Sequence, residues 1–234
     1  MENAVSDLHG CFDLFERALK KIDFSQNDTM YILGDVLDRG EEPIKLLLHI
    51  MDDPYSFKMI NGNHELNFLE NCKYAFSDET LIDDMLKYDN YLSNGGAITL
   101  KQFKKCNEKT QEKIVNYLKK QGLYFEIPKR SIVMTHGGIS NFSVDKKLED
   151  YSERDLTLHR YKSGECFFPN KILICGHTPT LKPDKTSAEI FVASNNEFGD
   201  FYKIDCGCVY PDHGGRLAVL RLDDMEKIYI DKGM

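Results

Sequence analysis

The first 65 residues alternate short apolar runs with amphipathic stretches, and no other feature of the chain restricts the fold as strongly. Apolar runs at residues 4–5, 30–33 and 57–60 predict three strands. Between them, apolar residues recur at helical spacing over residues 12–22 and 44–51, which predicts two helices. This βαβαβ order predicts parallel pairing of the three strands, because a helical crossover brings the chain back to the same end of the sheet.

The rest of the chain changes character twice. Residues 66–120 are mainly polar with helical patterning, interrupted by the turn Asn94-Gly95-Gly96, so we expect a helical insertion here, which we call the cap. Further strands are predicted at residues 123–127, 131–135, 171–175, 190–193, 201–205, 217–222 and 227–230. We therefore expect a single domain over residues 1–234, of the α/β class, in which two sheets face each other with helices outside.

Composition excludes several classes of protein. The 234 residues are 41% hydrophobic and 29% charged, which is ordinary for a globular domain and excludes disorder. A balance of 30 Lys and Arg against 38 Asp and Glu gives a net charge of −8, so stable binding to nucleic acid is not expected. Because no apolar run approaches the roughly eighteen residues of a membrane span, and the start lacks a signal-peptide pattern, we expect no membrane association and a cytoplasmic location. The seven cysteines are expected to be free thiols.

Side chains that bind metals occur where predicted strands give way to loops. The carboxyl ends of strands in open α/β sheets are where ligands bind, because the loops there converge. Four of the seven histidines lie in segments with this placement. The segments are Asp7-Leu8-His9-Gly10, Gly34-Asp35-Val36-Leu37-Asp38-Arg39-Gly40, Gly62-Asn63-His64-Glu65, Thr135-His136-Gly137-Gly138 and Cys175-Gly176-His177-Thr178. Each segment alone is common in turns, but their combination in one chain indicates a function.

Carboxylate, imidazole and amide donors together suit Mn²⁺, Fe or Zn²⁺. Asp7 and His9 lie two residues apart on an extended segment and can reach one ion. Asp35, from the neighbouring strand, can bridge to a second ion. The remaining donors for that ion are Asn63, His136 and His177. Two such ions about 3.5 to 4 Å apart hold a hydroxide nucleophile and stabilise an in-line displacement at phosphorus, and their charge would attract an anionic substrate to an acidic protein.

Taken in order, these segments resemble the calcineurin-like metallophosphoesterases, and within them the bacterial and phage form of the phosphoprotein phosphatases. The tail Ile204-Asp205-Cys206-Gly207-Cys208-Val209-Tyr210 and the turn Asn94-Gly95-Gly96 also look like that branch. The resemblance implies an α/β/β/α sandwich of two mixed sheets with a centre of two divalent metal ions, Mn²⁺ being the expected metal and Fe or Zn²⁺ the alternatives. The ligands that it implies are Asp7, His9 and Asp35 at one ion and Asp35, Asn63, His136 and His177 at the other.

A proton donor opposite the hydroxide would lower the cost of expelling an alkoxide. His64 adjoins Asn63 and is the natural candidate for this general acid. Asp38 could hold its imidazole in the correct tautomer, as a carboxylate does in catalytic triads, and the family resembled here gives both positions these roles. Glu65 is expected to orient the following helix, and nothing in the spacing of His159 demands a metal.

Two arginines are candidates for binding phosphate. Arg39 offers a forked guanidinium for the phosphoryl oxygens. Arg160 resembles a second phosphate-binding arginine of the family, with a surface residue paired to Glu153 or Asp155 as the alternative. The sequence also departs from the protein-phosphatase pattern, because Asn61 stands where an arginine often precedes the Gly-Asn-His-Glu motif.

The leading functional prediction is a metal-dependent phosphomonoesterase, specifically a protein serine/threonine phosphatase with phosphorylated proteins as partners. The alternative is hydrolysis of dinucleoside polyphosphates such as diadenosine tetraphosphate, because relatives with very similar motifs perform it. Aromatic side chains in the cap, which could stack on adenine, do not decide between the two. A third class, the catalytically silent binding scaffold, is disfavoured because the predicted metal ligands and His64 are all present.

Overall fold

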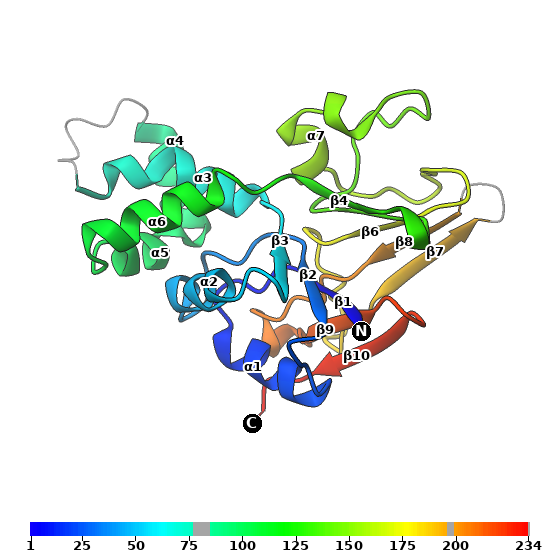
Figure 1. Ribbon diagram of the computed structural model, residues 1–234, viewed down its shortest axis with the longest axis horizontal. Helices are drawn as coiled ribbons and strands as arrows, with labels where there is room; N and C mark the ends of the chain where they lie inside the picture. Colours follow the sequence, from blue (N-terminus) through cyan, green and yellow to red (C-terminus); the bar gives the residue numbers. More distant parts are fainter. Residues whose placement is uncertain (77–84, 196–198, 234) are drawn as a thin grey trace.

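The computed structural model describes residues 1–76, 85–195 and 199–233. Within these residues two mixed five-stranded sheets lie against each other (Figure 1). The first has the order β10-β9-β1-β2-β3 and comprises β1 (Glu2–Val5), β2 (Thr29–Ile32), β3 (Phe57–Met59), β9 (Leu217–Arg221) and β10 (Glu226–Ile230). The second has the order β4-β5-β6-β8-β7 and comprises β4 (Tyr124–Ile127), β5 (Ile132–Thr135), β6 (Ile172–Cys175), β7 (Phe191–Asn195) and β8 (Gly199–Lys203). The predicted parallel pairing of β1, β2 and β3 is confirmed.

The first sheet separates two layers of the core. Met30 of β2 belongs to the buried cluster under the helices, whereas its neighbour Tyr31 belongs to the cluster between the sheets, because successive side chains of a strand point to opposite faces. Helices α1 (Phe12–Lys21) and α2 (Pro43–Asp52) cover the outer face (Figure 1). The sandwich of two mixed sheets predicted from the sequence is therefore confirmed.

The helical insertion extends the same outer layer. The predicted cap begins within α3 (Asn63–Asn71) and continues with α4 (Met85–Tyr91), a π-type turn (Leu92–Gly96), α5 (Ala97–Phe103) and α6 (Glu108–Leu118). Phe68, Phe103 and Leu118 join the buried cluster that also holds the apolar faces of α1 and α2. Residues 77–84 of the predicted cap lie outside the described residues. None of the helices in the described ranges is both long and apolar enough to cross a bilayer.

The outer face of the second sheet carries less helix than that of the first. In the described part this face is covered by the short helix α7 (Glu153–Thr157) and long loops (Figure 1). Leu148 and Phe167 of these segments pack on Leu173 and Phe201 of the sheet. Gly164, Pro169 and Asn170 favour turns here, so apolar side chains carried by loops take the place of a long helix.

Candidate functional site

The five predicted segments meet at the carboxyl ends of the strands. Asp7 and His9 follow β1, Asp35 follows β2, Asn63 and His64 follow β3, His136 follows β5 and His177 follows β6. The backbone links these loops directly, because the amide of His9 donates to the carbonyl of Asp35 at 2.8 Å and the amide of Gly176 donates to the carbonyl of His136 at 2.7 Å. The site therefore spans both sheets.

Asp35 is shared by two groups of potential metal donors. Its Oδ2 lies 3.8 Å from His9 Nε2 and 3.9 Å from His64 Nε2, and these donors form the first group. The same oxygen lies 3.3 Å from His136 Nε2, which with His177 forms the second group. In each group the donor atoms lie within 4.8 Å of one another. A carboxylate common to two donor groups is the arrangement that two neighbouring divalent ions need.

Two histidines are oriented by backbone carbonyls. The Nδ1 of His9 lies 2.8 Å from the carbonyl oxygen of Leu37, and the Nδ1 of His136 lies 2.7 Å from that of Leu33. A carbonyl can only accept, so both Nδ1 atoms carry the proton and both Nε2 atoms face Asp35. Metal-binding histidines are fixed by this kind of outer contact.

Two predicted donors stand beside these groups. The Oδ1 of Asn63 lies 3.0 Å from His136 Nε2, close enough to share an ion with it. Asp7 belongs to neither of these donor groups. Its Oδ2 accepts the amide of His177 at 2.9 Å and also contacts the Ser6 hydroxyl. Its carboxylate is nonetheless within electrostatic reach of His136 and Asp35. The first group contains His64 where the sequence-based assignment has Asp7.

The backbone at the site is held in unusual conformations. Twelve described residues other than glycine have a positive φ, and six of them are Asp7, His9, Asp35, Asp38, Arg39 and His177. Such conformations persist only where the surroundings hold them, and they concentrate at functional sites. Gly62 is required for close approach, because a Cβ there would lie 2.2 Å from Asp35 Oδ1 and 2.9 Å from the His136 ring.

Buried acidic side chains give the site a negative potential that favours bound cations. The five acidic side chains of the site are at most 4% exposed, and they are Asp7, Asp35, Asp38, Glu65 and Asp205. Burial raises the pKa of Asp7 to about 6 and lowers the pKa of His9 to about 3. Burial opposes the protonation of His136, but the adjacent Asp35 carboxylate outweighs it and raises the pKa of His136 to about 10. Oxygen and imidazole donors in a buried anionic cluster fit divalent cations, which would displace the His136 proton.

Arg39 lies between two of the histidines. Its Nη1 donates to His9 Nε2 at 2.7 Å, and its Nη2 is 2.9 Å from His64 Nε2 and 3.2 Å from Asn94 Oδ1. An imidazole nitrogen has one lone pair, so a metal ion on His9 Nε2 would take the place of the Arg39 contact. The Arg39 guanidinium would then be free to bind an anion beside His9 and His64.

His64 is held by a carboxylate, as predicted for a general acid. Its Nδ1 lies 2.7 Å from Asp38 Oδ2, and the two side chains are 1% and 0% exposed. Sequence reasoning missed two further partners of Asp38, the hydroxyls of Tyr91 and Thr99 in the cap. The turn Asn94-Gly95-Gly96 between them is the one local signal that could have pointed to this contact.

Glu65 organises the loop that carries Asp35. Its carboxylate accepts the amides of Asp35, Val36, Leu37 and Gly62 at 2.7 to 3.0 Å. It therefore joins the start of α3 to the loop after β2, a larger role than the orientation of one helix.

The segment after α7 borders the His136 turn. The amide of Gly137 donates to the carbonyl of Leu156 at 2.8 Å, and a Cβ at Gly138 would lie 2.8 Å from the His159 ring. His159 in turn contacts Glu165 at 2.9 Å through its Nε2. Arg160 is exposed, and its positive charge acts on His177 across the site. Within the described residues Arg160 forms no ion pair with Glu153 or Asp155.

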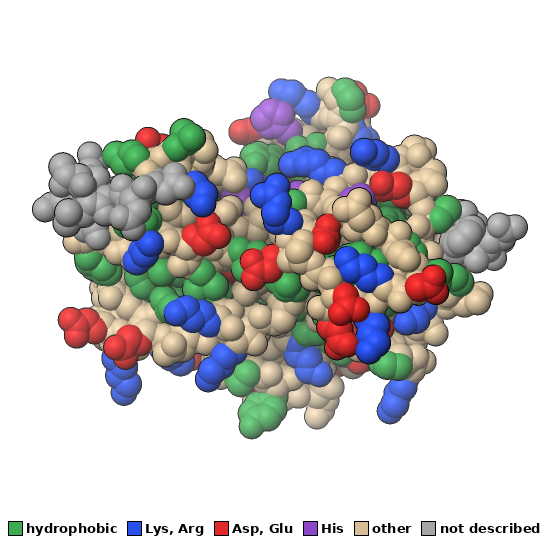
Figure 2. Space-filling view, turned by 90° about the horizontal axis from the view of Figure 1, so that it is seen from above, with side chains coloured by type: hydrophobic (Ala, Val, Ile, Leu, Met, Phe, Trp, Pro, Cys, Tyr) green, Lys and Arg blue, Asp and Glu red, His purple; other side chains and the backbone are tan. Residues whose placement is uncertain are grey.

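A groove of about 510 Å³ leads away from Asn63 between the cap and α7. Its lining is rich in amides and carries two cations, Lys87 and Arg154, and two acids, Glu70 and Glu153; the amide side chains are Asn63, Asn67, Asn71, Asn90 and Asn94. Figure 2 shows Lys and Arg side chains, with histidines between them, near the middle of the face that lies uppermost in Figure 1. An anionic substrate could therefore approach from this side despite the net negative charge.

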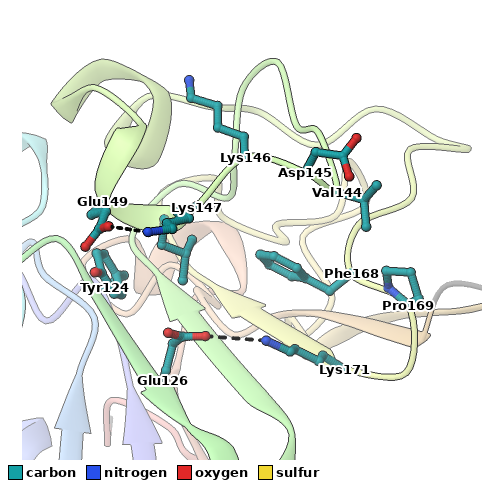
Figure 3. Close-up of a pocket in the computed structure, with 11 residues that line it drawn as sticks. Tyr124, Glu126, Val144, Asp145, Lys146, Lys147, Glu149, Phe168, Pro169 and Lys171 are labelled. Carbon is teal, nitrogen blue, oxygen red and sulfur yellow. Dashed lines mark hydrogen bonds and ion pairs between the residues drawn. The ribbon is translucent and has the colours of Figure 1, made fainter.

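A pocket of about 670 Å³ lies elsewhere, beside the edge strand β4 (Figure 3). Four of its six charged side chains form two ion pairs: Lys171 lies 3.4 Å from Glu126, and Lys147 lies 3.3 Å from Glu149. It holds none of the predicted site residues. We therefore place the chemistry at the strand ends and not in this pocket.

Comparisons with known proteins agree with this geometry. Residues 4–206 match the profile of a family described as calcineurin-like phosphoesterase. A symmetrical bis(5'-nucleosyl)-tetraphosphatase of Buchnera aphidicola subsp. Schizaphis graminum is 30% identical over 173 residues, which are 72% of this chain and 57% of that protein. A protein of the same name from Legionella pneumophila is 26% identical over 187 residues, 77% of this chain and 59% of that protein. The chain thus spans less than two thirds of the length of these relatives.

Solved structures share the fold. A protein provisionally named as a diadenosine tetraphosphatase superposes with a TM-score of 0.65 at 16% identity, covering 98% of this chain and 92% of its own. A protein serine/threonine phosphatase from Saccharomyces cerevisiae superposes with a TM-score of 0.64 at 14% identity, covering 100% of this chain and 80% of its own. At these identities the likeness concerns the fold alone.

Proposed function

The chain belongs to the calcineurin-like phosphoesterase family, and from this premise we propose that it hydrolyses dinucleoside tetraphosphates symmetrically. The observation that carries the proposal is that relatives aligned over 72% and 77% of the chain bear the name of that activity. Among the two substrates considered from the sequence, the nucleotide therefore replaces the phosphoprotein as first choice. The amide-rich groove beside Asn63 supports it, because amides can hydrogen-bond the edges of a nucleobase.

The donor set fits two divalent ions. We assign Asp7, His9 and Asp35 to one ion and Asp35, Asn63, His136 and His177 to the other, with Mn²⁺ as the proposed metal. When bound, such ions supply a hydroxide nucleophile at neutral pH and stabilise charge at the attacked phosphorus. Asp7 is preferred to His64 as a ligand, because the contact between His64 Nδ1 and Asp38 suits an imidazole that carries and donates a proton.

Four side chains are proposed to donate the proton, contact the phosphoryl group and hold the loop of the site. Asp38 fixes the His64 imidazole, and His64 gives a proton to the leaving oxygen. Arg39 contacts the Nε2 atoms of both His9 and His64, so its guanidinium stands where a phosphoryl group would meet the general acid. Glu65 keeps the Asp35 loop in place through four backbone amides.

One observation favours the second candidate, a protein serine/threonine phosphatase. A nucleoside diphosphate leaves a phosphoric anhydride readily, whereas a serine alkoxide needs a proton as it departs. The Asp38–His64 pair is fully buried and firmly hydrogen-bonded, a proton donor built for a poor leaving group. We therefore retain this candidate and test it against the first.

The discriminating experiment compares substrates on the Mn²⁺-loaded protein. We expect kcat/KM for diadenosine tetraphosphate to exceed that for a phosphoserine peptide at least tenfold, with ADP as the only nucleotide product. 4-Nitrophenyl phosphate serves as the reference that reports whether the site is active at all. The reverse ranking would make the protein phosphatase the correct assignment, and ATP with AMP as products would refute symmetrical cleavage.

Arg160→Ala is expected to weaken substrate binding. Arg160 is exposed and unpaired with the acids of α7, and its charge reaches His177, so it can contact a phosphate at the ions. Loss of one charge-assisted contact should raise the inhibition constant of inorganic phosphate about tenfold with little change in kcat. Lys162→Ala, which removes the same charge two residues away, is the matched control. Equal phosphate inhibition of both variants would transfer this role to another arginine.

A further inference from the structure

Two hydroxyl groups of the cap converge on the carboxylate that holds His64. The Oδ1 of Asp38 accepts the hydroxyl of Tyr91 at 3.1 Å and the hydroxyl of Thr99 at 2.5 Å. Its Oδ2 lies 2.7 Å from His64 Nδ1. Both oxygens of a side chain that is 0% exposed are therefore engaged, and two of the three partners come from a segment more than fifty residues away in sequence.

The direction of both hydroxyl bonds is fixed. The amide of Asp38 donates to Thr99 Oγ1 at 3.0 Å, which occupies the acceptor side of this hydroxyl and turns its proton to the carboxylate. Burial, and then the neighbouring Asp38 charge, raise the pKa of Tyr91 far above its ordinary value, so the phenol stays protonated and donates. Asp38 itself has a left-handed backbone with φ 68°, a conformation that needs support from outside the loop.

The cap turn is shaped to reach this loop. The π-type turn Leu92–Gly96 places Tyr91 and Thr99 against one carboxylate oxygen, and such turns are frequent at functional sites. Gly95 has φ 104°, its carbonyl accepts the amide of Arg39 at 3.1 Å, and a Cβ there would lie 2.6 Å from Arg39 Cγ. A Cβ at Gly96 would lie 2.3 Å from the Tyr91 ring. The two glycines thus permit an approach that any side chain would block.

We propose that Tyr91 and Thr99 are positioning residues, which hold Asp38 and through it fix the His64 imidazole for proton donation to the leaving group. The inference rests on the proposed role of His64 as general acid. Without the two hydroxyls the Asp38 carboxylate can rotate, and its hydrogen bond to His64 Nδ1 weakens. The two cap hydroxyls thereby control how well His64 is oriented for proton donation, although neither contacts the reacting atoms.

The test uses leaving groups of different basicity on the Mn²⁺-loaded full chain. For the double variant Tyr91→Phe, Thr99→Val we expect kcat on phenyl phosphate to fall about tenfold, with KM nearly unchanged. On 2,4-dinitrophenyl phosphate, whose leaving group needs no proton, kcat should stay within about threefold of the parent. The single variant Thr99→Ser keeps the hydroxyl at this position and should retain the parent rate on both esters.

A spectroscopic readout separates positioning from general damage. In the metal-free protein the downfield proton signal of His64 Nδ1–H, identified by its absence in His64→Asn, should shift or broaden in the double variant. Ser93→Ala is the matched control. It removes a hydroxyl from the same turn, but this hydroxyl donates to the carbonyl of Asn90 and not to Asp38. This control should leave both the signal and the two rates as in the parent, and thermal unfolding confirms that the variants fold.

The outcomes distinguish this inference from the proposed function. If His64→Asn spares phenyl phosphate, the general-acid role itself is wrong. If His64→Asn slows phenyl phosphate but the double variant does not, or slows both esters equally, positioning by the cap is wrong and the acid role stands. In the His64→Asn background the two hydroxyl substitutions should have no further effect on phenyl phosphate, and an additive loss would overturn the inference.

Discussion

Asp35→Asn should abolish bound metal and catalysis together. The Oδ2 of Asp35 lies 3.3 to 3.9 Å from the Nε2 atoms of His9, His64 and His136, so one carboxylate belongs to both donor groups. Asparagine has the same shape, but it removes the negative charge and can present an N–H where an ion needs a lone pair. We expect turnover of 4-nitrophenyl phosphate with Mn²⁺ to fall by about 10³ or more.

The measurement has two parts, elemental analysis after dialysis and steady-state kinetics. Asp28→Asn is the matched control: Asp28 is also buried, but it precedes β2 whereas Asp35 follows it, so the two carboxylates lie at opposite ends of one strand. The control should keep the metal content of the parent. An Asp35→Asn protein that retains full metal content and turnover would show that Asp35 does not bridge.

The strands and the convergence of the candidate site residues could be predicted from the sequence because both depend on local patterns. Apolar runs at residues 30–33 and 57–60 become β2 and β3 within one residue at each end. The candidate metal ligands follow predicted strands closely, so strand prediction places them at one edge of a sheet. His9 and His136 accordingly meet at Asp35, although 127 positions separate them in the chain.

The contacts that complete the site come from parts of the chain without a local signal. Thr99 and Tyr91 look like ordinary helix residues, and their role emerges only when the turn Leu92–Gly96 meets the Asp38 loop. His159 has no metal-ligand spacing, yet its ring packs against Gly138. Such long-range contacts depend on how the helices and strands pack, so they cannot be predicted from the periodicity of apolar residues in the sequence.

The substrate also cannot be predicted from local sequence patterns. The proposed metal donors and His64 would serve any phosphoric ester or anhydride, so they do not distinguish a phosphoprotein from a dinucleotide. We propose that the groove beside Asn63, whose walls include parts of α3, α4 and α7, determines specificity. The sequence order of these helices says little about their facing side chains. The choice of substrate therefore follows from relatives and from kinetics.

The second large effect is expected for His64→Asn, which should slow turnover while leaving metal content intact. His64 is 1% exposed and its Nδ1 is 2.7 Å from Asp38 Oδ2, a contact that suits the proton-donor role proposed for this ring. On phenyl phosphate, whose phenolate is a poor leaving group, the loss of a general acid should lower kcat by about 10² or more. On 2,4-dinitrophenyl phosphate the loss should be much smaller, because that leaving group departs without a proton.

The substitution also decides between the two assignments of His64. Donor geometry alone places His64 with His9 and Asp35, so His64 could instead be a ligand of the first ion. In that case His64→Asn would reduce the metal content and slow both esters equally. As a general acid, it would spare the metal and act in proportion to the basicity of the leaving group. Elemental analysis beside the two rates therefore separates a ligand from a proton donor, and metal loss with a uniform drop in rate would replace Asp7 by His64 in the proposed centre.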